Sequence, residues 1–266
     1  MDVETGYADI DGARLYYETA GAGEAVVFIH GFALDRRMWD AQMAPFAARF
    51  RAVRYDLRGF GRSAPPAGAP YSHAGDLLAL LRRLGIARAS LVGLSLGGAV
   101  AADAALAAPE MVARLVLADA LLSGHRWSDA WHAAAGPAWA LGRAGDLAGA
   151  RRAWLAHPLF APALANERAA PHLRGMVEDY SGWHWSHRDP ARDPQPPALA
   201  RLGAIRAPTL IVMGERDLPD FWAIARAAQQ GIPGAQTVVL PGVGHLANME
   251  APERFNQVVL GFLAGR

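Results

Sequence analysis

Three residues whose types suit nucleophilic catalysis each follow a short apolar run of the sequence: Ser95, Asp217 and His245. A serine is a weak nucleophile at pH 7, so it needs a base within hydrogen-bond reach, and that base must be oriented by a third group. This pattern predicts that Ser95 is a nucleophile, that His245 takes its proton and that Asp217 orients the imidazole.

More than one carboxylate could serve as the acid, because others lie near Asp217 in the sequence. Glu215 and Asp220 flank the predicted acid, and Asp119 follows a different apolar run. Asp217 is preferred because its distance from the end of the preceding strand best places a carboxylate behind the imidazole, and Asp119 is kept as the alternative.

The serine lies at the centre of Gly93-Leu94-Ser95-Leu96-Gly97, between an apolar run and an alanine-rich segment. This spacing predicts a buried strand, a sharp turn with the serine at its apex, and a helix. Glycines on both sides allow strand and helix to approach closely. The N–H of Leu96 would then face the reacting carbonyl oxygen, and Phe32, in the loop after strand 25–29, would supply a second N–H.

Strands and helices alternate along most of the chain, which predicts an α/β fold with a mainly parallel sheet covered by helices on both faces. The Asp11-Gly12 pair predicts an initial hairpin over residues 7–18. The predicted strands that follow cover residues 25–29, 52–55, 89–92, 114–118, 209–213 and 237–240, and the predicted helices cover residues 38–50, 72–84, 97–108, 221–230 and 252–263.

Residues 121–202 interrupt this alternation with helical stretches and no convincing strand. They contain six of the eight tryptophans and six of the nine histidines. We therefore predict a core domain of residues 1–120 and 203–266, with a helical cap of residues 121–202 over the carboxyl ends of the strands. Trp183, His184 and Trp185 either line the substrate pocket under this cap or form the core of the cap itself.

Five segments in this order resemble the α/β-hydrolase fold family with a helical cap: His30-Gly31-Phe32, Asp56 to Ser63, Gly93 to Gly97, Gly214 to Asp217 and Gly244-His245. The resemblance covers nearly the whole chain and implies an eight-stranded sheet. Residues 54–119 are most similar to 3-oxoadipate enol-lactonases and related small esterases. The chain differs from that group at Phe32, where a serine is common, and in its tryptophan-rich cap.

Composition excludes several kinds of chemistry. The chain has no cysteine, and all of its 26 basic residues are arginines, so thiolate nucleophiles and lysine Schiff bases are absent. A formal net charge of +1 gives no reason to expect nucleic acid or a membrane as partner. The polar beginning of the chain predicts a cytoplasmic protein. We expect no cofactor and no metal, and the protein is expected to be a monomer or a dimer.

These features predict a cofactor-independent serine hydrolase that acts on small carboxylic esters or lactones. An alternative on the same fold is cleavage of a carbon–carbon bond, as in diketone hydrolases or hydroxynitrile lyases. The loop after His30-Gly31 lacks the Gly-Pro-Gly run of diketone hydrolases, which disfavours it. Halide and epoxide hydrolases of this fold have aspartate in place of Ser95, and a receptor without activity has no need of the three catalytic residue types.

Overall fold

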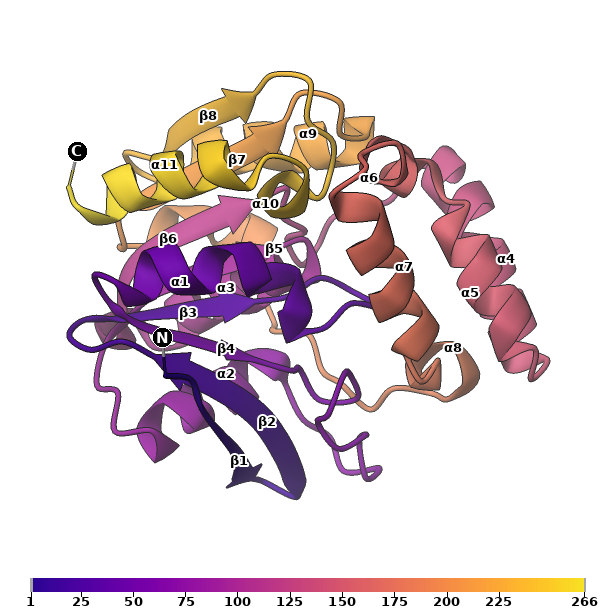
Figure 1. Ribbon diagram of the computed structural model, residues 1–266, viewed down its shortest axis with the longest axis horizontal. Coiled ribbons are helices and arrows are strands. Elements are labelled where there is room, and N and C mark those ends of the chain that lie inside the picture. Colours follow the sequence, from indigo (N-terminus) through magenta and orange to yellow (C-terminus); the bar gives the residue numbers. More distant parts are fainter. Residues whose placement is uncertain (1, 266) are drawn as a thin grey trace.

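The computed structural model describes residues 2–265, and its centre is one eight-stranded sheet with the order β1-β2-β4-β3-β5-β6-β7-β8 (Figure 1). Neighbouring strands from β4 to β8 are parallel, whereas β2 is antiparallel to both of its neighbours. The strands are β1 (Glu4–Ile10), β2 (Ala13–Ala20), β3 (Ala25–Ile29), β4 (Arg51–Tyr55), β5 (Ala89–Leu94), β6 (Val112–Ala118), β7 (Thr209–Gly214) and β8 (Gln236–Leu240).

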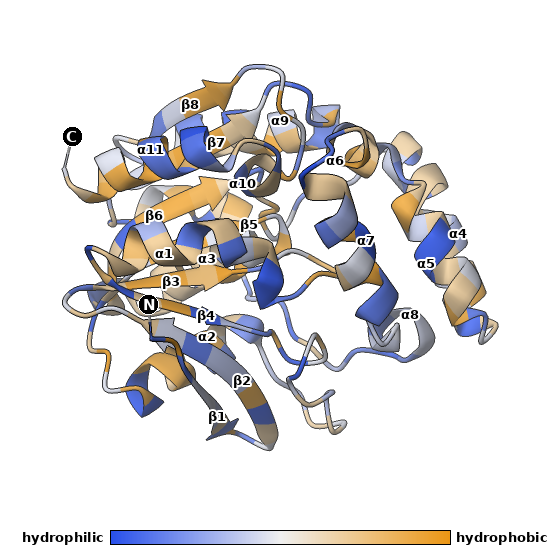
Figure 2. Ribbon diagram, in the orientation of Figure 1, coloured by the Kyte–Doolittle hydropathy of each residue, from blue (hydrophilic) through white to orange (hydrophobic). Residues whose placement is uncertain are grey.

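Helices cover both faces of the sheet, as the alternating pattern predicts. In Figure 1, α1 and α11 lie together in front of the strands, while α2 and α3 pack against each other on the other face. Every residue of β3, β5 and β7 is buried as a result, and Figure 2 shows the central strands as the most apolar part of the chain. The core helices are α1 (Asp40–Ala47), α2 (His73–Arg83), α3 (Leu96–Ala107), α9 (Pro219–Gly231), α10 (Ala247–Glu250) and α11 (Pro252–Leu263).

The predicted hairpin is confirmed, with Ile10 of β1 opposite Ala13 of β2. Asp11 and Gly12 both have positive φ, 38° and 77°, which a two-residue hairpin turn requires. The helix predicted over residues 38–50 differs in its bounds. A 3-10 turn over Arg36–Trp39 comes first, because the Asp35 carboxylate accepts the Arg37 amide at 2.8 Å and so starts the helical turn earlier.

The turn between β5 and α3 brings three backbone segments into contact. Ser95, at its apex, has φ 55° and ψ −116°, a strained conformation for a residue other than glycine. A Cβ atom on Gly93 would lie 2.1 Å from the Gly97 carbonyl oxygen, and one on Gly97 would lie 2.0 Å from the Ile29 carbonyl oxygen. Strand, turn and helix therefore pack at a distance that no larger residue permits.

Between β6 and β7 the chain forms five α-helices at the end of the sheet toward which the parallel strands point (Figure 1). Aromatic stacking joins them to the core, with Phe32 on Trp139 at 5.3 Å and Phe60 on His184 at 4.2 Å between ring centroids. None of the helices among residues 2–265 has the length and apolar character needed to cross a membrane. The five are α4 (Asp129–Arg143), α5 (Leu147–Leu155), α6 (Ala161–Leu164), α7 (Ala169–Asp179) and α8 (Trp183–Ser186).

The close contact at Gly97 predicts an unusually large effect of a single methyl group. Gly97→Ala places a Cβ against backbone, which cannot rotate away, so we expect a loss of at least about 3 kcal/mol of unfolding free energy. Gly261→Ala in α11 is the control, because a Cβ there meets nothing within 4 Å and alanine favours the helix by about 0.5–1 kcal/mol. Urea unfolding of both variants measures the contrast, and equal stabilities would contradict this account of the turn.

Candidate active site

Ser95 lies at the amino end of α3, beside the loop that follows β3. Its amide donates to the Ala118 carbonyl at 3.1 Å, which ties the turn to the end of β6. A Cβ on Gly31 would lie 3.5 Å from the Ser95 Cβ, which is ordinary van der Waals contact. The two segments predicted to surround the reacting carbonyl therefore lie side by side.

The amides of Phe32 and Leu96 both belong to these two segments. Leu96 is the first residue of α3, and neither amide donates a hydrogen bond to another group among residues 2–265. His30 holds the loop from behind: its Nδ1 contacts the Gly31 carbonyl oxygen at 2.8 Å, and its Nε2 accepts the Leu57 amide at 2.9 Å. This fully buried imidazole thus has a structural role in the loop.

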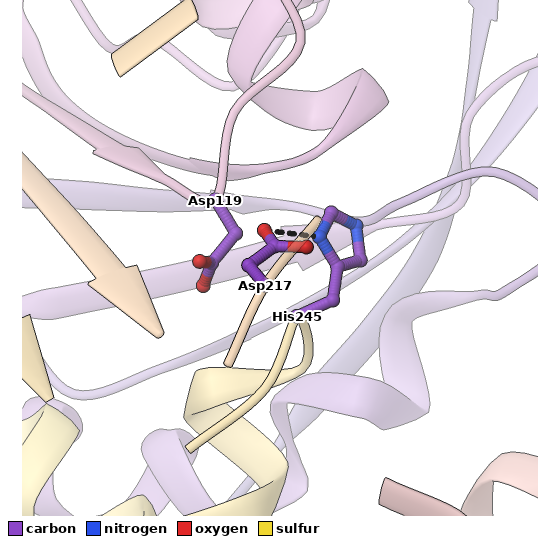
Figure 3. A group of neighbouring side chains, drawn as sticks. All are labelled: Asp119, Asp217 and His245. Carbon is purple, nitrogen blue, oxygen red and sulfur yellow. Dashed lines mark hydrogen bonds and ion pairs between the residues drawn. The ribbon is translucent and has the colours of Figure 1, made fainter. Parts of the chain in front are cut away.

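His245 and Asp217 form a buried hydrogen-bonded pair (Figure 3). The imidazole Nδ1 lies 2.8 Å from Asp217 Oδ2, and the two side chains are 2% and 0% exposed. The other oxygen of Asp217 accepts the Leu218 amide at 2.7 Å, which fixes the orientation of the carboxylate. The Phe221 ring packs against the imidazole at 4.3 Å. The imidazole is therefore held in one orientation, with Nε2 directed away from the acid.

The two turns that carry this pair are held together by their backbones. The Arg216 amide donates to the Val243 carbonyl at 2.8 Å. A Cβ on Gly214 would lie 2.0 Å from the Gly244 carbonyl oxygen, so only glycine lets the end of β7 approach the loop after β8 this closely. The glycines of both motifs thus determine the distance between acid and base.

Glu250 is a further residue that positions the imidazole, and the sequence patterns did not reveal it. Its carboxylate accepts the Gly244 amide at 2.7 Å and the Leu246 amide at 3.1 Å, which are the residues on either side of His245. Burial raises the pKa of this carboxyl, and the two amide donors oppose that effect. In the sequence, the only indication of this role is a carboxylate five residues after His245.

Asp119, the alternative acid, lies on the side of Asp217 that is away from His245 (Figure 3). Its Oδ1 accepts the Gly214 amide at 2.7 Å, and its Oδ2 is buried with no partner among the described residues. Burial and the neighbouring Asp217 carboxylate raise the pKa of the Asp119 carboxyl well above its ordinary value. The carboxylate that accepts the hydrogen bond of His245 is therefore that of Asp217, and Asp119 accepts the Gly214 amide instead.

Asp119, Asp217 and His245 also have atoms within 4.8 Å of one another, which is a spacing that metal ligands could have. However, Asp119 Oδ1 accepts the Gly214 amide, Asp217 Oδ1 accepts the Leu218 amide, and Asp217 Oδ2 is hydrogen-bonded to His245 Nδ1. The expectation that the site uses no metal stays a prediction.

Ser95 and His245 line one cavity of about 230 Å³. Its wall combines leucines with seven aromatic side chains: Phe32, Trp127, Trp131, Trp139, Trp154, Phe160 and Phe221. Trp131, Ala135 and Trp139 recur at intervals of four residues on α4, so helical periodicity could have identified the two tryptophans as neighbours on one face.

Trp183, His184 and Trp185 are not among the residues that line this cavity, in contrast to the first of the two roles predicted for them. Trp185 is buried among the cap helices, and His184 stacks on Phe60 while its Nδ1 lies 2.7 Å from the Tyr180 hydroxyl. Trp183 stacks on His187 at the surface. The structure places these three residues in the packing of the cap and its contact with the core.

The segment from Asp56 to Ser63 supports this contact without lining the cavity. Arg58 pairs with Asp76 through two hydrogen bonds of 2.8 and 2.7 Å and lies over the Tyr71 ring. Gly59 lets the His184 ring approach, since a Cβ there would lie 2.6 Å from it. Arg58 and Gly59 thus maintain the shape of the loop and its contact with His184.

The fold and these motifs belong to a known class of proteins. The Alpha/beta hydrolase family matches residues 26–258, and the chain is a member of it. The resemblance noted from the sequence motifs is thereby confirmed, together with the eight-stranded α/β fold.

Relatives within this family have several activities in their names. The chain is 33% identical to "Putative carbamate hydrolase RutD" of Klebsiella pneumoniae over 85% of its own length and 86% of the relative. It is 27% identical to 3-oxoadipate enol-lactonase 1 of Acinetobacter baylyi, over 90% of this chain and 88% of that one. A thermophilic esterase from Thermogutta terrifontis has a TM-score of 0.83 and 28% identity, with 98% of each chain covered.

The raised pKa of Asp119 predicts a pH-dependent effect of its replacement by asparagine. The raised pKa means that the folded protein keeps a proton that the unfolded chain releases above about pH 3.9, so this carboxyl lowers stability progressively as pH rises. Asp119→Asn keeps the acceptor for Gly214 and removes the titration. We expect the stability of the variant relative to the natural protein to grow with pH, by up to about 1.4 kcal/mol per unit. Urea unfolding between pH 4 and 8 tests this, and a constant difference would contradict it.

The hydrogen bonds of Glu250 predict a loss of stability that a surface glutamate does not share. Glu250→Gln replaces one of two acceptors by an N–H group and leaves a buried amide unpaired, at a cost of about 1–3 kcal/mol. The control is Glu253→Gln, because Glu253 is 74% exposed and its replacement should change stability by no more than about 0.5 kcal/mol. Thermal and urea unfolding compare them; two equally stable variants would show that Glu250 does not hold the histidine loop.

Proposed function

We propose that this protein is a serine hydrolase of carboxylic esters or lactones, with Ser95 as nucleophile, His245 as general base and Asp217 as the orienting acid. The observation that carries the proposal is the position of His245, between the buried Asp217 carboxylate and the cavity that Ser95 also lines. A base in this position has one ring nitrogen engaged by the acid and the other available to the nucleophile.

The reaction proceeds in two halves through a covalent intermediate. The Ser95 hydroxyl attacks the ester carbonyl while His245 takes its proton, and the resulting imidazolium is stabilised by Asp217. The tetrahedral intermediate collapses as His245 gives the proton to the leaving alcohol. Water then attacks the acyl-enzyme by the same route, releases the acid and restores Ser95.

The negative charge that develops on the carbonyl oxygen is held by the backbone N–H groups of Phe32 and Leu96. Both amides are without another partner among residues 2–265, and Leu96 lies at the positive end of the α3 helix dipole. Donors of this kind contribute about 3 kcal/mol each to stabilisation of the transition state. Because the strained Ser95 turn and the His30 hydrogen bonds fix both segments, the donors need little reorganisation.

Residues 121–202 act in this proposal as a cap that closes the site from above, over the core of residues 1–120 and 203–266. Aromatic side chains from α4 and α5 form the wall opposite Ser95, which keeps bulk water from the acyl-enzyme. The substrate is accordingly a small molecule. Relatives named enol-lactonase and esterase support hydrolysis of an ester bond as the reaction of this chain.

Covalent labelling tests the nucleophile directly. A fluorophosphonate should modify the natural protein once, at Ser95, and Ser95→Ala should abolish both labelling and hydrolysis of p-nitrophenyl butyrate, with a loss of roughly a million-fold in kcat. Ser181→Ala, at an exposed serine of the cap, is the matched control and should keep both. Peptide mass spectrometry, with circular dichroism to verify folding, gives the readout. An unlabelled natural protein, or a folded Ser95→Ala variant with full activity, would contradict the assignment of Ser95 as the nucleophile.

A further inference from the structure

The cavity beside Ser95 has an unusually uniform lining. Apart from Ser95 and His245, each described residue that lines it is a glycine, leucine, phenylalanine or tryptophan. No arginine and no carboxylate is among them. A group that enters this cavity next to the reacting carbonyl therefore meets mainly apolar surface.

The arginines in the loops near the site are occupied elsewhere. Arg36 pairs with Glu18 and Asp56, and Arg58 pairs with Asp76; these guanidinium groups are buried with their partners. Neither residue lines the cavity. Their positive charge is neutralised within the core and is not directed at a substrate.

No charged side chain of residues 121–202 lines the cavity. Two imidazoles pack against its tryptophans. The His125 ring lies 5.0 Å from Trp127 between centroids, and its Nε2 lies 3.1 Å from Asp220 Oδ1. The His157 ring lies 4.8 Å from Trp131 and 5.5 Å from Trp154. Burial lowers its pKa to about 4, so it is neutral at pH 7. On the core side, the nearest group behind His245 is the Asp217 carboxylate, which repels a second anion.

Within the part of the chain that the structure describes, the amino end of α3 directs positive potential at the cavity, and its effect is confined to the first turn of the helix. That turn faces the carbonyl oxygen of the ester. A carboxylate further along the acyl group would lose its hydration and gain no partner, a state that proteins avoid because of its large free-energy cost.

We infer that the cavity binds an uncharged, apolar acyl group, aliphatic or aromatic, and excludes esters and lactones whose acyl part carries a carboxylate. This inference rests on the proposed function, since it assigns the cavity to the acyl group of the Ser95 intermediate. A site that binds an anionic acyl group needs a cation to pair with it, and no arginine lines this cavity among the described residues.

A pair of p-nitrophenyl esters isolates the charge. One is the monoester of glutaric acid, which has a free carboxylate, and the other is its methyl ester, which is similar in shape and neutral. The natural protein should favour the neutral compound by at least about 100-fold in kcat/KM. In the series from acetate to hexanoate, each added methylene should raise kcat/KM about fourfold until the cavity is full.

A gain-of-function variant tests the cause. Trp139 is half-buried and stacks on Phe32 at 5.3 Å, and a planar guanidinium in its place can keep that stacking. Trp139→Arg should raise kcat/KM for the carboxylate ester relative to the neutral ester at least tenfold. Trp139→Leu, the control for lost size, should leave the preference for the neutral ester unchanged.

The outcomes distinguish a failure of the acyl specificity from a failure of the serine mechanism. If the fluorophosphonate labels Ser95 but the charged and neutral esters react within tenfold of each other, the acyl specificity is wrong and the serine mechanism stands. If Ser95 is not labelled and neither ester is hydrolysed, the proposed function fails and the specificity fails with it. Should Trp139→Arg not fold, the ratio in the natural protein still decides.

Discussion

Close backbone contact at the carboxyl ends of the strands is the constraint on which the rest of the site depends. Gly97 meets the Ile29 carbonyl, and Gly214 meets the Gly244 carbonyl, each at a distance that excludes a Cβ. The first contact places Ser95 beside the loop of Phe32, and the second places the Asp217 turn beside the His245 loop. Two pairs of segments distant in sequence are thus held at fixed distances. One pair positions the proposed nucleophile and an oxyanion donor, and the other positions the proposed acid and base.

A second constraint is the burial of several carboxyl groups behind one imidazole. Asp119, Asp217 and Glu250 all lie close to His245, and ionising every one of them without cations would be costly. Backbone amides and one raised pKa offset this cost. Glu250 accepts two amides of the histidine loop, Asp217 accepts the Leu218 amide and the imidazole N–H, and the raised pKa of Asp119 favours the neutral form of its carboxyl. The imidazole is then oriented by a single carboxylate, and the others act as supports for its loop.

The sequence predicted the core well because the core follows local rules. Buried parallel strands appear as continuous apolar runs, and the hairpin is encoded by Asp11-Gly12. Asp217 and His245 were predicted as partners from their positions after neighbouring strands, and the structure brings them within 2.8 Å. The role of Glu250 and the raised pKa of Asp119 were not predictable, because both depend on burial and on neighbours that only the folded chain brings near.

The cap shows where local patterns lose their power. A run of aromatic residues such as Trp183-His184-Trp185 has the same composition whether it lines a cavity or packs beneath it, and its contacts depend on the loop of Phe60 far away in sequence. The tryptophans that line the cavity are instead spread over α4, α5 and the segment before them, and they meet only when these elements fold over Ser95. Core and cap are therefore subject to different constraints. Glycine contacts hold the backbone segments that carry the proposed reacting groups, whereas the cavity wall is built from side chains that can be exchanged with less effect on the fold. In the proposed mechanism the sheet edge therefore determines the chemistry, and the aromatic surface that covers it determines the selectivity.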